Sequence, residues 1–168
     1  AEFEGRRHPG FRPGPGGALF GYAVIVDTKG NDLYRSHRPS QGSGRFGFAM
    51  LLDLEGDDVY DAYIDSQGFG KFGAGILEDV AGSDRYDGFN QVQGVGQTGG
   101  IGLLFDRAGN DVYVANNSVL DFPSPQSPQA NVSMAQGTGN GRRADFLDGR
   151  SLAGGVGILF DQSGNDTY

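Results

Sequence analysis

Ten aspartates in this sequence recur at fixed spacing and could bind cations. They occur in five pairs, each inside the phrase Asp-x-x-Gly-x-Asp-x-Tyr, and the first Asp of the phrase recurs after 26, 26, 27 and 55 residues. The last interval is close to two periods. Carboxylates are ligands that hard cations such as Ca²⁺ prefer. The candidate metal ligands are Asp27, Asp32, Asp53, Asp58, Asp79, Asp84, Asp106, Asp111, Asp161 and Asp166.

The same period predicts the architecture that must position these pairs. A second phrase, Gln-Gly-x-Gly, recurs in step with the first, beginning at Gln41, Gln67, Gln93 and Gln136. Fixed periods of about 20–50 residues are typical of repeat architectures. We therefore expect an all-β fold, a right-handed parallel β-solenoid (β-helix) with turns of about 26 residues, tight Gly corners and two or three short strands per turn.

A short apolar run precedes the first Asp of every phrase and predicts a strand. The second residue before Asp is always aliphatic and the fourth is always small, as in Leu51 and Ala49. Because side chains alternate along a strand, both positions are expected to face inward. The opposite face, which includes Met50 and Phe48, is apolar too. Strands that are apolar on both faces are usually buried on both, so we expect the N-terminal arm, an insertion or another chain to cover it.

Stacked turns would place the aspartates in two columns of like charge. Unit charges about 4.8 Å apart repel by roughly 1 kcal/mol in water and roughly 3–4 kcal/mol at an effective dielectric constant near 20. Several such contacts rival the total stability of a domain, about 5–15 kcal/mol. The repulsion must be offset by bound cations, raised pKa values or backbone donors at the corner.

The segments 30–34, 56–60, 82–86, 109–113 and 164–168 each read Gly-x-Asp-x-Tyr. They resemble the second half of the RTX nonapeptide, Gly-Gly-x-Gly-x-Asp-x-apolar-x. The resemblance implies that Ca²⁺ binds between stacked turns, that the Tyr column lines the core, and that the setting is extracellular and rich in calcium. It implies side-chain ligands at Asp32, Asp58, Asp84, Asp111 and Asp166. The chain departs from that family because Asp-x-x replaces Gly-Gly and the period is 26. The alternative is that these aspartates only make turns.

Two further columns have structural interpretations. The Gln side chains of the second phrase are expected to form a hydrogen-bonded amide ladder, and the five Tyr residues are expected to stack. His37, Tyr63 and Phe89 share the third place after Tyr, which predicts a short column of rings.

Two insertions interrupt the repeat. Residues 1–17 lack the period and are rich in Pro and Gly, so we expect an arm or linker, followed by a single solenoid domain over 18–168 with insertions at about 114–135 and 140–153. Insertions in one repeat often lie on a binding face. A paired-carboxylate or arginine site for a glycan is one hypothesis for the second insertion, and a solvated, salt-bridged loop is the other. The candidate ligand-binding residues are Arg142, Arg143, Asp145, Asp148 and Arg150.

Composition limits the possible partners. The net charge is −8 and the pI about 4.5, which disfavours nucleic acid, because its binding depends on Lys and Arg contacts to phosphate. There is no run approaching the roughly 18 apolar residues of a membrane span. The absence of Cys and the presence of only two His exclude an ordinary zinc site. Divalent cations, glycans, a second copy of the chain or a covering chain are the expected partners.

These observations predict a calcium-stabilised structural or adhesive module of a secreted or cell-surface protein. One alternative is a β-helix that binds or cleaves polysaccharide through the insertions, and another is a subunit of a self-assembling filament. Catalytic sites are usually singular, so repeated columns are not expected to be catalytic. The sequence stops within a unit at Tyr168, and we expect either a longer protein or a covering chain at that end.

Overall fold

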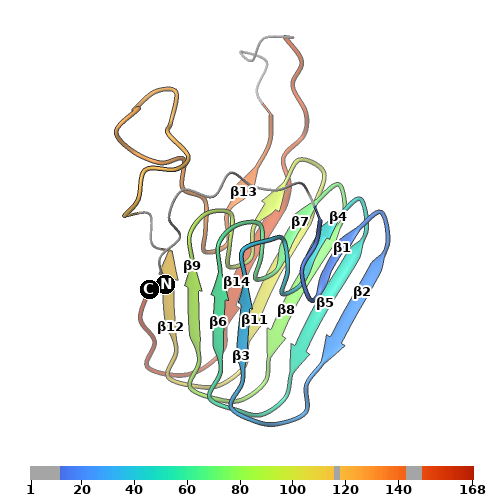
Figure 1. The fold of residues 1–168 in the computed structure, drawn as a ribbon, viewed down its shortest axis with the longest axis vertical. Coiled ribbons are helices and arrows are strands. Elements are labelled where there is room, and N and C mark those ends of the chain that lie inside the picture. The colour runs from blue at the N-terminus through green and yellow to red at the C-terminus, as the bar shows by residue number, and fades with distance from the viewer. Residues whose placement is uncertain (1–11, 116–117, 143–148) are drawn as a thin grey trace.

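The computed structural model describes residues 12–115, 118–142 and 149–168, and these residues form an all-β solenoid of about four turns (Figure 1). Each full turn contributes one strand to each of three parallel sheets, and successive turns are about 26 residues apart. The described residues contain no helix. The predicted fold class is therefore confirmed.

The three sheets are named A, B and C in the order in which the chain enters them. Sheet A has the order β1 (Gly17–Leu19), β4 (Ser43–Arg45), β7 (Phe69–Lys71), β10 (Gly96–Gln97) and β13 (Gly139–Asn140). Sheet B has the order β2 (Tyr22–Val26), β5 (Phe48–Asp53), β8 (Ala74–Asp79), β11 (Ile101–Asp106) and β14 (Val156–Asp161). Sheet C has the order β3 (Leu33–Ser36), β6 (Val59–Ala62), β9 (Arg85–Gly88) and β12 (Val112–Ala115).

The register between turns places equivalent residues of the repeat directly side by side. In sheet B, Asp53 pairs with Asp79, which pairs with Asp106. In sheet C, Tyr60 pairs with Tyr34 and with Tyr86. The phrases detected in the sequence are thus columns in space. Each Asp pair lies at the corner between sheets B and C, and the stacking of the turns brings these pairs together.

The core consists of the inward residues that the alternation predicts. Leu51, Leu77 and Leu104 are fully buried, and so is the small residue Ala49. Five tyrosines form a column in which successive ring centroids are 4.8–5.0 Å apart and the planes differ by 2–7°. This stack confirms the predicted packing of the Tyr residues.

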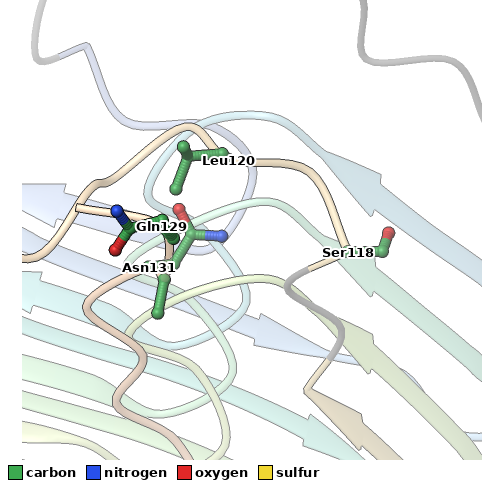
Figure 2. A pocket seen from close by; sticks show the side chains of 5 residues that line it. Ser118, Leu120, Gln129 and Asn131 are labelled. Atoms are coloured by element: carbon green, nitrogen blue, oxygen red, sulfur yellow. The ribbon is translucent and has the colours of Figure 1, made fainter. Parts of the chain in front are cut away.

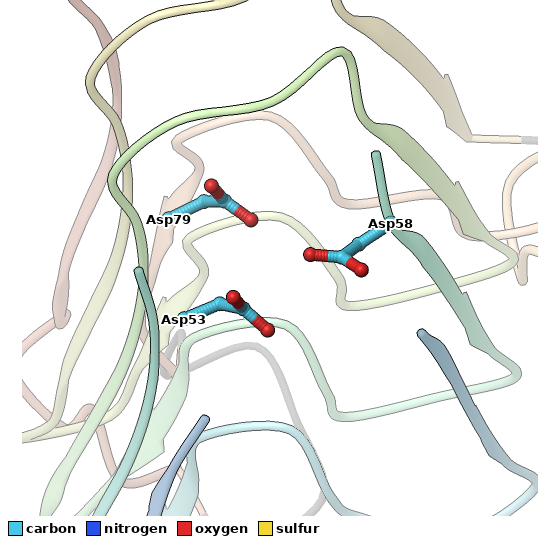
Figure 3. Close-up of side chains that lie close together, drawn as sticks. All are labelled: Asp53, Asp58 and Asp79. Carbon is cyan, nitrogen blue, oxygen red and sulfur yellow. The ribbon is translucent and has the colours of Figure 1, made fainter. Parts of the chain in front are cut away.

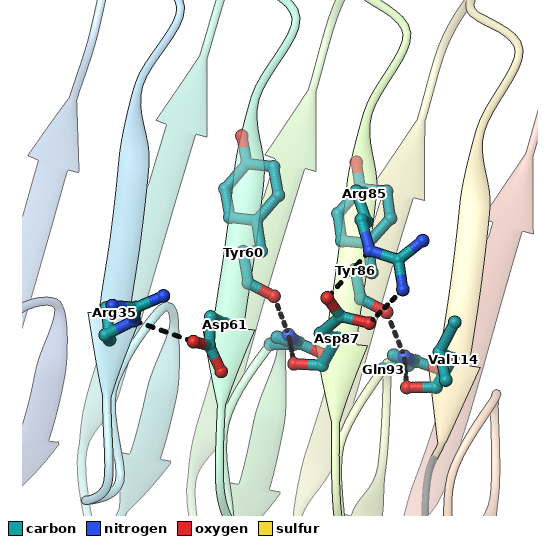
Figure 4. A network of polar contacts seen from close by, with 9 residues as sticks. Arg35, Tyr60, Asp61, Arg85, Tyr86, Asp87, Gln93 and Val114 are labelled. Carbon is teal, nitrogen blue, oxygen red and sulfur yellow. Dashed lines mark hydrogen bonds and ion pairs between the residues drawn. The ribbon is translucent and has the colours of Figure 1, made fainter. Parts of the chain in front are cut away.

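The Gln side chains bond to backbone rather than to one another. The Nε2 of Gln93 donates to the carbonyl oxygens of Tyr86, at 3.0 Å, and of Val114 in the next turn, at 3.1 Å (Figure 4). Gln67 makes the same pair of bonds one turn earlier. The φ angles of Gln67 and Gln93 are 55° and 63°, so the corner backbone is left-handed at these positions. The expected amide-to-amide ladder is replaced by amides that join carbonyls of successive turns.

The first insertion is anchored to the solenoid by an aromatic contact. Tyr63 and Phe89 pack with centroids 5.1 Å apart, as the ring column predicts, and Phe122 of the insertion lies 5.9–6.1 Å from both rings. In the second insertion, Arg142 and Leu152 form an antiparallel bridge. The described parts of both insertions extend beyond the strands at the same side of the molecule (Figure 1).

Glycine at the B–C corner is required because successive turns approach closely there. A Cβ atom added to Gly82 would lie 1.6 Å from the carbonyl oxygen of Gly56, and both residues are held by backbone hydrogen bonds to the next turn. We expect Gly82→Ala to lower the free energy of unfolding by about 4 kcal/mol or more, or roughly 10 °C in melting temperature. Gly21→Ala is the control, because its nearest neighbour would be 3.8 Å away. Equal melting temperatures for the two variants would contradict this packing.

Candidate metal centre

The two Asp columns lie inside the solenoid, at the corner between sheets B and C. Asp53 ends β5 and Asp58 directly precedes β6, and both side chains point inward with 1% of their surface exposed. In the next turns Asp79, Asp84 and Asp106 are 0–2% exposed. Figure 3 shows Asp53 and Asp79 one above the other, with Asp58 directed towards them across the corner. In the middle turns the repeat therefore brings its acidic pairs together away from water, whereas the pairs at the two ends of the stack are half-buried.

Tyrosine hydroxyls are the main donors to the first column. The Tyr60 hydroxyl donates to Asp79 Oδ2 at 2.6 Å, and the Tyr86 hydroxyl donates to Asp106 Oδ2 at 2.7 Å. Each tyrosine thus bonds to the aspartate of the following turn. The repeat pattern predicted only packing for the Tyr column, and this hydrogen-bonding role was not predicted. The invariant Tyr two residues after the second Asp was the available signal.

Backbone amides are the donors to the second column. The N–H of Asp32 donates to Asp58 Oδ1 at 2.6 Å, and the N–H of Asp58 donates to Asp84 Oδ1 at 2.7 Å. The same bond joins the N–H of Asp84 to Asp111 Oδ1, at 2.7 Å. Backbone donors therefore supply part of the compensation that stacked carboxylates require, through one oxygen of each side chain.

The Oδ1 of Asp79 accepts a further bond from the Ala81 N–H at 3.2 Å, but one oxygen of each of the five other fully buried column aspartates lacks a hydrogen-bond partner. These oxygens are Asp53 Oδ1, Asp58 Oδ2, Asp84 Oδ2, Asp106 Oδ1 and Asp111 Oδ2. A buried acceptor without a partner loses its hydration and gains nothing in return, and the loss is larger for a charged group. Hydrogen bonds from Tyr hydroxyls and backbone amides therefore satisfy only one of the two oxygens in each of these carboxylates.

The unpartnered oxygens belong to groups of carboxylates that converge. In each of three groups, every residue offers a carboxylate oxygen within 4.8 Å of those of the other two. The first two groups consist wholly of buried residues, and the second and third share one aspartate. The groups are Asp53, Asp58 and Asp79; Asp84, Asp106 and Asp111; and Asp111, Asp161 and Asp166.

The ion pairs among the described residues are made by other acids. Arg35 pairs with Asp61 at 2.7 Å and Arg85 with Asp87 at 2.8 Å on the outer side of sheet C (Figure 4). Arg45 pairs with Asp65, and Arg107 with Glu78. The described Arg and Lys side chains thus form no ion pair with either Asp column, and the negative charge of the columns has no side-chain counter-ion there.

Burial of this charge shifts the acidity of the columns. Desolvation raises the pKa of Asp58 to about 6 and that of Asp79 to about 7. It raises the pKa of Asp84 to about 9 and that of Asp111 to about 7, with nearby aspartates adding to the effect. Without a cation, the solenoid therefore favours protonated carboxyl groups at this corner.

The residue between Gly and the second Asp of each phrase forms a third column, and this column is exposed and stabilised by turn hydrogen bonds alone. The N–H of Ser83 donates to Asp57 Oδ1 at 2.8 Å, and the N–H of Asp57 donates to Asn31 Oδ1 at 3.1 Å. These side chains are exposed, so their remaining polar atoms can bond to water. The exposed column is explained by its turn, whereas the buried columns are not.

The candidate glycan residues of the second insertion are only partly placed. Arg142 and Arg150 flank it, whereas Arg143, Asp145 and Asp148 lie outside the described residues. The first insertion contains a cavity of about 200 Å³ lined by Ser118, Leu120, Gln129, Ala130 and Asn131 (Figure 2). None of these five lining residues is charged. The glycan hypothesis remains a prediction.

Comparison with known proteins assigns the chain to no family. No helix in the described part of the chain has the length and apolarity that a membrane crossing requires. No protein-family model matches the chain, and neither a curated protein nor a solved structure gives a significant match. What the chain shows is a parallel β-solenoid with clustered, buried aspartates.

Proposed function

We propose that the chain is a calcium-stabilised β-solenoid that serves as a structural or adhesive module of a secreted or cell-surface protein. The observation that carries the proposal is the set of unpartnered oxygens in converging, buried carboxylates. A cation between successive turns would contact these oxygens and leave the Tyr and backbone hydrogen bonds in place.

Charge balance supports a divalent ion. Each turn adds two carboxylates to the columns, and no described Arg or Lys pairs with them. Neutralising a turn therefore takes one divalent cation or two protons. The raised pKa values of Asp58 and Asp84 mean that ionised carboxylates without a cation are unfavourable at this corner. A divalent ion also joins two turns, which stiffens the stack.

Ligand chemistry favours Ca²⁺ over Mg²⁺ and transition metals. The groups contain carboxylate oxygens only, and these suit hard cations rather than zinc or copper. Mg²⁺ usually keeps several waters, whereas Ca²⁺ accepts irregular sets of protein oxygens. A fully buried corner with 0–2% exposure favours the ion that gives up water more readily. The RTX resemblance of the Gly-x-Asp-x-Tyr segments adds to this choice.

The repetition of the sites supports a structural role. The first Asp of each pair recurs in register from turn to turn, and carboxylate groups recur along the stack, whereas a catalytic centre would be expected once. A calcium-loaded stack would form a stiff rod that displays the two insertions on one side. Calcium is abundant outside cells, where such a rod would remain loaded. Polysaccharide binding through the second insertion and filament formation stay alternative predictions.

The test loads the metal during folding, because an ion held at the buried corner is expected to exchange slowly with solvent. The protein is unfolded in denaturant with EGTA, desalted, and refolded with Ca²⁺, with Mg²⁺ at equal ionic strength, or with neither. We expect a Ca²⁺-specific rise in melting temperature that grows with the logarithm of Ca²⁺ concentration. A protein that melts at the same temperature in all three conditions would refute the calcium proposal and leave proton sharing as the way the charge is balanced.

A further inference from the structure

The outer face of sheet B is an apolar surface that the described chain leaves open. At its edges Tyr22 is 90% exposed, Val24 60% and Val156 54%. The outward residues of five strands, each of five or six residues, form this face, which is called the sheet B face. Its residues are Tyr22, Val24, Val26, Phe48, Met50, Leu52, Ala74, Ile76, Glu78, Ile101, Leu103, Phe105, Val156, Ile158 and Phe160.

The sheet B face is almost free of charge. Its single ionisable acid is Glu78, and Arg107 neutralises it through an ion pair of 2.7 Å. A partner for this surface therefore needs to be apolar and uncharged as well. Parallel sheets occur almost only with both faces covered, and a contiguous apolar patch of this kind marks an interaction site.

A column of phenylalanines extends the face around the A–B corner. Phe20, Phe46 and Phe72 stack with centroids 4.8 and 4.9 Å apart. They have φ angles of 48–52° and remain 40–75% exposed. A left-handed backbone is unfavourable for a bulky residue, and exposing its ring is a second disadvantage. Gly99, with φ of 62°, lies against the Phe72 ring in the next turn, so the corner can be built without a ring.

We propose that two copies of this chain associate through their sheet B faces. Five strands about 4.8 Å apart and six residues at about 3.3 Å each give a face of roughly 24 by 20 Å. Two such faces bury on the order of 1,000 Å², and the Phe column adds to this. That area is near the lower limit for a specific interface. Twisted sheets pack face to face at about −30°.

A second copy fits the face better than the other occupants do. The one cationic side chain at the face, Arg107, is paired with Glu78 and lies over the Phe105 ring, so the phosphate groups of anionic lipid or nucleic acid find no unpaired cation among the described residues of the face. The described parts of both insertions extend beyond the strands (Figure 1) rather than over the face. The face of a second copy has the same width and the same lack of net charge. A two-fold axis would pair this one surface patch with its own copy.

Sedimentation velocity over about 1–200 µM protein, in Ca²⁺ and in its absence, tests the pairing. We expect the weight-average mass to rise from monomer towards dimer. Ile76→Lys, at the centre of the face, and Val24→Lys, on its more exposed edge strand, should each weaken association at least tenfold, because both would bury a charge. Val59→Lys, on the outer side of sheet C, is the matched control and should dimerise normally.

Three results would overturn the proposal. The first is a chain that stays monomeric over the whole range. The second is association that the two sheet B lysines leave unchanged, which would place the contact elsewhere, such as at the open ends of the stack. The third is monomeric protein that floats with vesicles of neutral phosphatidylcholine, which would make the face a lipid-binding surface. Melting temperatures of all variants confirm that each is folded, and Val24→Lys keeps the test open if Ile76→Lys does not fold.

Discussion

Asp84→Asn is expected to raise the stability of metal-free protein and to lower that of calcium-loaded protein. Burial raises the pKa of Asp84 to about 9, so folding without metal near pH 7.5 requires this carboxyl group to take up a proton. Asn is neutral in both states and removes that requirement. Its side-chain oxygen can still accept the hydrogen bond from the Asp58 N–H. With Ca²⁺ present, the same change removes one ligand charge from the group Asp84, Asp106 and Asp111.

The size of this effect sets the design of the experiment. A change of 1 kcal/mol moves the melting temperature of a domain of this size by about 2–4 °C. We expect a rise of about 5 °C without metal and a fall of at least 5 °C with saturating Ca²⁺. Asp57→Asn is the control, because it changes the same charge on an exposed side chain that bonds only at the turn. Equal behaviour of the two variants in both conditions would contradict a metal site at Asp84.

The stability of metal-free protein is expected to fall as the pH rises from about 4 to about 9. Burial raises the pKa of Asp58 to about 6, of Asp79 and Asp111 to about 7, and of Asp84 to about 9. The folded chain therefore binds more protons than the unfolded chain throughout that window. Under that condition the free energy of unfolding decreases with pH. All four shifts act in the same direction, so a clear decrease in the free energy of unfolding across this window is expected.

Calcium should reverse this dependence. Ca²⁺ binds the deprotonated carboxylates, so its stabilising effect grows as protons leave them. Denaturant midpoints at pH 5, 7 and 8.5 should show curves with and without Ca²⁺ that meet near pH 5 and separate at pH 8.5. Metal-free protein that is most stable at pH 8.5 would show that the buried carboxyl groups are compensated without protons or metal.

The solenoid could be predicted because every level of the repeat agrees. The period fixes the turn, and alternation fixes which residues, such as Leu77 and Gly75, face inward. Stacking of equal phrases then places Asp53 beside Asp79. These inferences need only the spacing of residues along one chain and the geometry of parallel strands.

The hydrogen bonding of the site could not be predicted from spacing. The bond from the Tyr60 hydroxyl to Asp79 joins residues 19 apart in different turns, and it depends on how far a ring reaches across the core. The left-handed backbone at Gln67 likewise directs its amide to carbonyls of two turns rather than to the next Gln. The oxygens that lack partners emerge only when these bonds are counted. The insertions have no period, so the repeat could not predict their structure.

The central claim is that the buried Asp columns hold calcium, and counting the bound metal tests it most directly. Protein unfolded with EGTA is refolded in Ca²⁺, separated from free metal by gel filtration, and analysed for calcium by elemental analysis. Two of the three carboxylate groups share Asp111, so two to three Ca²⁺ per chain are expected, with protons balancing the rest of the column charge, and fewer Ca²⁺ for Asp84→Asn. Fully folded protein that retains no calcium would contradict the claim and show that shared protons balance the charge in the solenoid.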